Sequence, residues 1–262
     1  MTLTKTVARG AAALVLALPL AAAAAPAAGG SDADQRFGKL GIGFYGISDI
    51  PIATAAHGGS QAAPTIDNPG PDKPVSAPAV GARYWFPMQS GLLKAVGVDV
   101  AIGIGASGGG DTTTVTQVGG VTTTVKQSNP SRNGFLFHLG VPLAFANFQN
   151  AVFEVIPEFN YGFSSGTLKD NAAAPVGGRP DLKLSGTRLD IGLRAGFEVY
   201  FGFVGLPQLA LEGTIGLAYT SESAKAELGN QSWKLSTSGF TTAHYNDPWD
   251  IFRGTVAARY YF

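Results

Sequence analysis

A strict two-residue alternation between apolar and polar side chains constrains the fold of this chain more than any other feature. Over residues 187–203 one phase is apolar and the other is small, polar or charged. Because successive side chains of a β-strand point to opposite faces, this period predicts a strand with one apolar and one polar face. Ordinary strands end after about five or six residues, whereas a strand that crosses a membrane needs about ten. The pattern therefore predicts a membrane-spanning strand whose polar phase faces an interior.

The alternation recurs in seven other segments, so we expect eight strands. The segments are joined alternately by short and long connections, and the short ones lie at 87–93, 146–150 and 203–208. Short periplasmic turns and long external loops are typical of bacterial membrane barrels. We therefore expect an all-β fold, an eight-stranded antiparallel up-and-down transmembrane β-barrel with both ends on the periplasmic side. The expected external loops are 48–78, 107–133, 164–184 and 220–249.

The second external loop contains a hairpin signal. Residues 112–118 and 121–126 flank Gly119 and Gly120, and two glycines between alternating segments favour a two-residue hairpin turn. We expect this hairpin to continue two barrel strands above the membrane. It either extends the sheet or exposes a β-edge to a partner strand.

The first residues have the pattern of a secretory signal. Lys5 and Arg9 precede an unbroken apolar run that small residues follow. The run is shorter than the ~20 residues that a helical membrane span needs. A signal peptide that is cleaved between residues 22 and 28 is therefore expected. The expected divisions are 1–25 as the signal peptide, 26–36 as a periplasmic segment and 37–262 as the barrel.

Charge and cysteine content exclude several classes of function. The whole chain has 18 basic and 18 acidic residues, and without Lys5 and Arg9 its net charge becomes about −2. Nucleic acid is therefore not expected as a partner. The chain has no cysteine, which excludes disulfides and thiolate metal sites. We expect no metal site and no cofactor.

The last residues carry the most specific likeness to a known family. Val256, Ala258, Tyr260 and Phe262 form an apolar phase that ends in a terminal aromatic residue. Together with the alternating segments, this resembles the small eight-stranded outer-membrane barrels of Gram-negative bacteria, the group of the OmpA membrane domain, OmpX and OmpW. The resemblance implies that these residues form the signal read by the barrel assembly machinery. It also implies an outer-membrane location, in contact with outer-membrane lipid and lipopolysaccharide.

The polar phases of the strands predict a charged interior. An eight-stranded barrel is just wide enough for side chains to fill it, and buried ions are tolerable only when they are paired. Equal numbers of the two signs therefore favour a closed interior network, and a charged lining of a narrow path is the alternative. The predicted lumen charge network comprises Lys39, Arg83, Arg188, Arg194, Arg253 and Arg259 with Asp99, Glu154, Glu158, Asp190, Glu198 and Glu212.

Chemical motifs are weak throughout the sequence. Two GxGxxG patterns lack the following helix that a dinucleotide site needs. Ser164 with His244 or Asp190 is a loose constellation for a lipid-modifying enzyme, and nothing in the sequence fixes its geometry. We therefore expect no catalytic residues and no enzymatic activity.

The expected function is that of a non-enzymatic barrel in the cell envelope. It would anchor or present external loops for adhesion, for assembly of a surface complex such as motility machinery, or for envelope integrity. Its partners would then include other envelope or surface proteins. The first alternative is a narrow, porin-like channel or port for small or apolar solutes, and a lipid-modifying barrel enzyme is a distant one.

Overall fold

Nearly all of the described chain is β-structure. The computed structural model describes residues 31–56, 65–67, 74–88, 91–109, 111–118, 121–128, 130–168, 181–242 and 254–262. The expected signal peptide lies outside these residues. Within them, no helix is long and apolar enough to cross a membrane.

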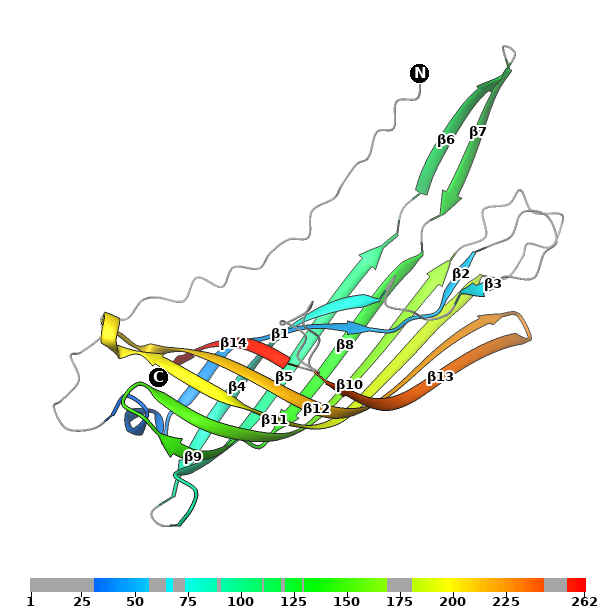
Figure 1. The fold of residues 1–262 in the computed structure, drawn as a ribbon. Helices are drawn as coiled ribbons and strands as arrows, with labels where there is room; N and C mark the ends of the chain where they lie inside the picture. The colour runs from blue at the N-terminus through cyan, green and yellow to red at the C-terminus, as the bar shows by residue number, and fades with distance from the viewer. Residues whose placement is uncertain are drawn as a thin grey trace.

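Eight antiparallel strands close into a barrel (Figure 1), which confirms the predicted fold. Neighbouring strands of the wall pair along the ring, and β14 closes it by pairing with both β12 and β1. Closure is needed in a bilayer because unpaired backbone groups find no water there. The wall strands are β1 (Leu40–Ile50), β4 (Val75–Pro87), β5 (Ala95–Gly108), β8 (Ser131–Gly140), β10 (Ala151–Leu168), β11 (Leu182–Phe201), β12 (Leu206–Leu228) and β14 (Gly254–Tyr261).

Two further strands extend the wall. β9 (Leu143–Asn147) follows β8 and pairs with β10 and β5. β13 (Gln231–Thr242) pairs with the extracellular part of β12, whereas β14 pairs with its periplasmic part. β13 and β14 thus lie one after the other along the same edge of β12. Residues 243–253 between them lie outside the described residues.

The strands reach further on the extracellular side than the alternation predicted. β10 continues to Leu168, and β12 and β13 form a hairpin across much of 220–249. The expectation that 164–184 and 220–249 are loops is therefore wrong for much of their length. At these strand ends the alternation is reversed: outward residues are largely polar, and several inward residues, such as Leu182, Leu184 and Ala226, are apolar. A search for outward apolar residues therefore misses them, although the backbone pairing continues.

The predicted hairpin of the second loop is present, but it does not continue the barrel sheet. It consists of β6 (Asp111–Val118) and β7 (Val121–Ser128), which form a separate two-stranded sheet. Gly108 and Gly109 precede it with positive φ angles, a backbone conformation that favours glycine and turns the chain away from β5. A second small sheet, β2 (Thr54–Ala56) with β3 (Thr65–Asp67), lies in the first loop.

The outer surface carries an apolar band of the height that a bilayer requires. Outward side chains are apolar over Leu189–Phe201 of β11 and apolar or glycine over Leu209–Tyr219 of β12. Leu193 and Leu217 lie opposite each other in this band, and each is about half exposed. The eleven residues on β12 match the ~9–11 residues of a membrane-crossing strand, and the thirteen on β11 are slightly more than it needs.

Aromatic pairs mark both borders of the band. Phe135 with Phe163 lies at the extracellular border, and Tyr260 with Phe262 lies at the periplasmic border. Beyond the extracellular border the outward residues become polar, as at Ser165 of β10. Aromatic girdles flanking an apolar band are the usual surface of a transmembrane barrel.

Candidate functional site: the closed interior

The inward phases of the wall strands bring charged side chains together in the middle of the barrel. Each of them is at most 6% exposed to solvent. Alternation explains their position, because every one sits one residue away from an outward apolar residue. We call this set the interior charge network: Arg83, Asp99, Glu154, Glu158, Arg194, Glu198, Glu212 and Arg259.

Arg83 on β4 is the centre of the interior charge network. Its Nε and Nη2 donate hydrogen bonds to Asp99 at 2.6 and 2.7 Å. Its Nη1 donates to Glu154 at 2.8 Å and to Glu198 at 3.4 Å, and its Nη2 also donates to Glu212 at 2.7 Å. One guanidinium thus holds carboxylates from β5, β10, β11 and β12. These contacts cross the lumen and fill it at this level.

Two further arginines complete the interior charge network. Arg259 Nη1 donates to Glu212 at 2.6 Å, and its guanidinium lies 4.4 Å from the centre of the Tyr45 ring, a cation–π contact. Arg194 Nε donates to Glu158 at 2.7 Å, and its Nη1 donates to Glu212 at 3.5 Å. Buried ions are costly unless they are paired and hydrogen-bonded, and this arrangement meets that condition through shared partners.

The predicted balance of six positive and six negative interior groups is not found among the described residues. Lys39 is exposed and precedes β1, so it does not join the network, because its position lies at the rim rather than in the lumen. Arg253 lies outside the described residues. The buried members of the predicted set are the arginines Arg83, Arg188, Arg194 and Arg259 and the acids Asp99, Glu154, Glu158, Asp190, Glu198 and Glu212, an excess of two acids.

Arg188 and Asp190 form a second buried ion pair on the extracellular side of the interior charge network. Arg188 Nε donates to Asp190 at 3.0 Å. Its Nη1 donates to the backbone oxygen of Asp49 at 3.2 Å. Both residues belong to the predicted set, but they lie in a separate layer of the lumen.

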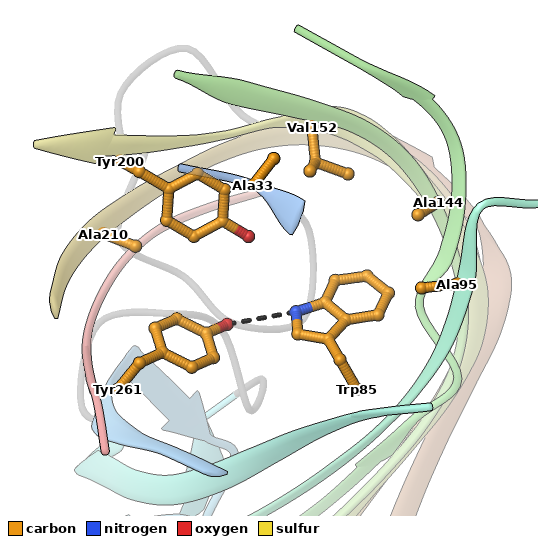
Figure 2. Packing of buried hydrophobic residues seen from close by; sticks show 8 residues of the cluster. All are labelled: Ala33, Trp85, Ala95, Ala144, Val152, Tyr200, Ala210 and Tyr261. Atoms are coloured by element: carbon orange, nitrogen blue, oxygen red, sulfur yellow. Dashed lines mark hydrogen bonds between the residues drawn. The ribbon is translucent and has the colours of Figure 1, made fainter. Parts of the chain in front are cut away.

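A layer of aromatic side chains closes the periplasmic end of the lumen. Figure 2 shows Trp85, Tyr200 and Tyr261 pointing into the barrel around Ala33. Trp85 Nε1 donates to the Tyr261 hydroxyl at 3.2 Å. The hydroxyls of Tyr200 and Tyr261 each donate to Glu198 at 2.8 Å. The aromatic layer is therefore hydrogen-bonded directly to the interior charge network.

Residues 31–38 fold into the periplasmic mouth and complete this closure. They include the short helix η1 (Asp34–Arg36). Ala33 is fully buried, Arg36 is 6% exposed, and the Phe37 ring meets the edge of Trp85 at 5.8 Å between centroids. We call residues 31–38 the periplasmic plug. The sequence predicted only a polar periplasmic segment here, because an eight-residue segment with a single, partly buried aromatic residue has no periodicity to reveal its packing.

Hydrogen bonds to the end of β9 and to the turn after it fix the periplasmic plug in place. The Asp32 amide donates to the backbone oxygen of Gln149 at 2.9 Å. Asn147 Nδ2 donates to Asp34 Oδ1 at 2.9 Å. These contacts tie the segment before β1 to the opposite side of the mouth.

The periplasmic plug predicts a difference in thiol accessibility. The chain has no cysteine, so each single-cysteine variant carries one thiol. We expect Ala33→Cys in the folded barrel to react with a charged maleimide at least about tenfold more slowly than Lys39→Cys, because Ala33 is buried and Lys39 is exposed. Mass spectrometry of labelling over time measures both rates. Equal rates would show that the mouth is open.

The end of β1 and the residues after it close the extracellular half. Asp49 and Ile50 still pair with Ser76 and Val75 of β4, and residues 51–53 continue inside the barrel to contact β10 and β11. Ser164 Oγ donates to the Pro51 oxygen at 2.6 Å, and a Cβ on Gly186 would lie 1.8 Å from that oxygen. Gly186 therefore has to be glycine for the chain to pass. We call residues 49–53 the crossing segment.

The crossing segment seals the lumen with apolar packing. Ile52 and Ala53 are at most 2% exposed and pack with Leu168, Leu182 and Leu184. The sequence did not predict the crossing segment. Its available signal was the run of small inward residues at 162–166 together with Gly186, which leaves space that long side chains do not fill.

Other polar side chains of the interior form hydrogen bonds within the barrel. Ser164 is 3% exposed and its hydroxyl donates to the backbone oxygen of Pro51. His244, its predicted partner, lies outside the described residues. His138 Nδ1 lies 2.5 Å from Asn160 Oδ1 inside the barrel. Among the described residues, no group of acids and histidines forms a metal-binding cluster.

Val256, Ala258, Tyr260 and Phe262 form the outward phase of the last strand. Tyr261 and Arg259 between them are buried inside. The Phe262 amide donates to the Leu40 oxygen at 3.0 Å, so the chain end is paired with the start of β1. The outward position is the predicted one, and the role of these residues as an assembly signal stays a prediction.

Comparison with known proteins gives one weak likeness. No protein family matches the chain, and no curated protein matches it. Among solved structures, a major outer membrane protein from Thermus thermophilus is similar at 16% sequence identity, covering 86% of this chain and 98% of that one, with a TM-score of 0.34. A likeness at this level carries no functional information.

Proposed function

We propose that the chain is a non-enzymatic, non-conducting outer-membrane barrel that anchors an extracellular β-structure for contact with another envelope or surface protein. The observation that carries this proposal is closure of the lumen at three levels. The periplasmic plug, the interior charge network and the crossing segment each fill the interior with buried side chains. A body closed in this way supports a role as an anchor rather than as a pore.

The extracellular part supplies the surface for such contact. β12 and β13 pair from Leu217–Thr242 to Leu228–Gln231, and nine of these twelve pairs, from Thr220–Gly239 on, lie beyond the border of the apolar band at Tyr219. Adhesion, assembly of a surface complex and envelope integrity are the roles that fit a rigid, projecting sheet. Outer-membrane lipid and lipopolysaccharide would surround the band, and the barrel assembly machinery would insert it.

Planar-bilayer recording tests the non-conducting barrel. The mature protein, inserted at single-molecule density in 1 M KCl, is expected to show no sustained discrete openings, because every charged group of the interior charge network is paired and shielded from water. An open porin inserted by the same procedure is the positive control. Steady openings of reproducible size would overturn the proposal.

A second candidate function is a port for apolar solutes. One observation favours it: within the described residues the pairing of β1 with β14 ends at Phe44–Ala258, and β13 pairs with β12 alone, so the wall has an unpaired stretch on this side. An apolar molecule that entered the extracellular half would be blocked below by the charged layer and would have to leave sideways. Faster uptake of an apolar dye by vesicles that contain the barrel than by empty vesicles, without ion conductance, would favour this candidate.

A further inference from the structure

β13 has a free edge within the part of the chain that the structure describes. Its twelve residues pair with Leu217–Leu228 of β12 on one side. On the other side the ring would place β1, but β1 pairs with β14 only over Gly41–Phe44. In Figure 1, β13 follows β12 and lies apart from the ends of β1 and β2.

The crossing segment explains why this edge is free. Residues 49–53 run into the lumen, where Arg188 and Ser164 hold the backbone oxygens of Asp49 and Pro51. Gly186 makes room for that path, so it is built into the neighbouring wall strand. The extracellular end of β1 is therefore held away from β13 by contacts deep in the barrel.

The free edge of β13 lacks the features that normally protect an exposed edge. Natural edge strands carry prolines, bulges or several charges, which prevent pairing with other chains. β13 has no proline and no acidic residue, its pairing with β12 is regular, and Lys234 is its one charged residue. Residues 231–239 of β13 pair with β12 beyond Tyr219, so this part of the edge lies above the apolar band and its backbone groups face water rather than lipid. It is thus accessible to a strand from outside the cell.

The charges around Lys234 indicate what that strand carries. Lys234 pairs directly across the sheet with Lys225, and like charges in this position are unfavourable. Lys225 is already ion-paired with Glu227 on its own strand. Lys234 has no acidic partner among the described residues. A carboxylate on an added strand, opposite Lys234, would relieve this repulsion.

The inward face of β13 indicates the other phase of the added strand. Trp233 packs against the apolar cluster of the extracellular half, and Leu235 is 37% exposed beside it. A strand added to this edge would place alternate side chains next to these two residues. Apolar side chains in that phase would cover them.

We infer that β13 accepts a strand from another envelope or surface protein, with apolar residues in its inward phase and an Asp or Glu opposite Lys234. This inference rests on the proposed presenting role and names the class of partner. Backbone hydrogen bonds along the edge would supply affinity, and the alternating side chains would supply specificity. A single carboxylate in register with Lys234 would fix which residues pair.

Site-specific photocrosslinking in intact cells tests the inference. A benzophenone amino acid at Ser236, which shares the outward phase with Lys234, is expected to crosslink one defined external protein at an alternating segment that contains Asp or Glu. The same probe at Ser221, in the middle of the wall on β12, is the control and is expected to give no protein crosslink. Lys234→Glu is expected to lower the Ser236 crosslink at least about tenfold, whereas Lys234→Arg leaves it unchanged. Lysine at the partner's acidic residue is expected to restore crosslinking to the Lys234→Glu barrel.

Each other outcome overturns the inference. A crosslink to residues of the same chain would show that the edge is covered internally, and a crosslink to a second copy would show self-association. Absence of a crosslink would show that no strand pairs with this edge. A crosslink that Lys234→Glu does not change would show that Lys234 does not select the partner by charge. Planar-bilayer conductance decides the proposed closed barrel independently of these results, so failure of one is distinguishable from failure of the other.

Discussion

Replacing Arg83 with methionine is expected to destabilise the folded barrel by about 3–5 kcal/mol or more. The substitution keeps an unbranched side chain but removes the guanidinium that holds Asp99, Glu154, Glu198 and Glu212. Removing one partner of a buried ion pair leaves the other charge uncompensated, and here several carboxylates lose the same partner. The described interior already has more acids than arginines, which increases the effect.

Equilibrium unfolding in urea, with the barrel in lipid vesicles, measures this loss. Tryptophan fluorescence reports the transition, and Trp85 lies next to Arg83, with its ring centre 5.2 Å from the guanidinium carbon. Lys39→Met is the matched control, since it removes an exposed positive charge and is expected to change stability by less than about 0.5 kcal/mol. Similar stabilities of the two variants would show that water reaches the interior carboxylates, and the closed lumen would then be untenable.

Placing arginine at Leu193 is expected to destabilise the barrel by about 2–4 kcal/mol. Leu193 points outward from β11 and lies opposite Pro157 of β10 and Leu217 of β12. All three belong to the apolar band. The guanidinium of an arginine at this depth either lies in the hydrocarbon or extends along the barrel surface to the membrane interface. Both positions cost free energy.

The same unfolding measurement in vesicles tests the depth of the band. Ser165→Arg is the control, because Ser165 is outward and exposed on β10 beyond the aromatic border at Phe163. It is expected to change stability by less than about 1 kcal/mol. If both arginines have the same effect, the assigned position of the membrane is wrong.

The sequence was sufficient to predict the strands of the barrel wall. Alternation over 187–203 and its counterparts placed the strands and their apolar faces, because in a bilayer the outward residue of every pair must be apolar. It also placed most of the charged interior, since Arg83, Asp99 and Glu212 lie in the opposite phase. The predicted charge balance failed at Lys39, because alternation has no information about where a strand leaves the lumen.

The loops show where the alternation rule stops working. Above the apolar band the outward residues are in water and can be polar, so β12 and β13 pair through a region that the sequence pattern assigned to a loop. The path of the crossing segment was not predicted either, because its residues have no two-residue period. Its position depends on Gly186 and Ser164, which are distant from Pro51 in the sequence.

By itself, the sequence determined the number of wall strands, their inward and outward faces and the presence of a charged interior. These features follow from a two-residue period that each strand carries locally. Only the tertiary structure decided that the periplasmic plug and the crossing segment enter the lumen, that Arg83 joins four carboxylates, and that β13 keeps a free edge. Each of these depends on contacts between residues far apart in the chain, where the space left by one strand is filled by a segment that shows no period of its own.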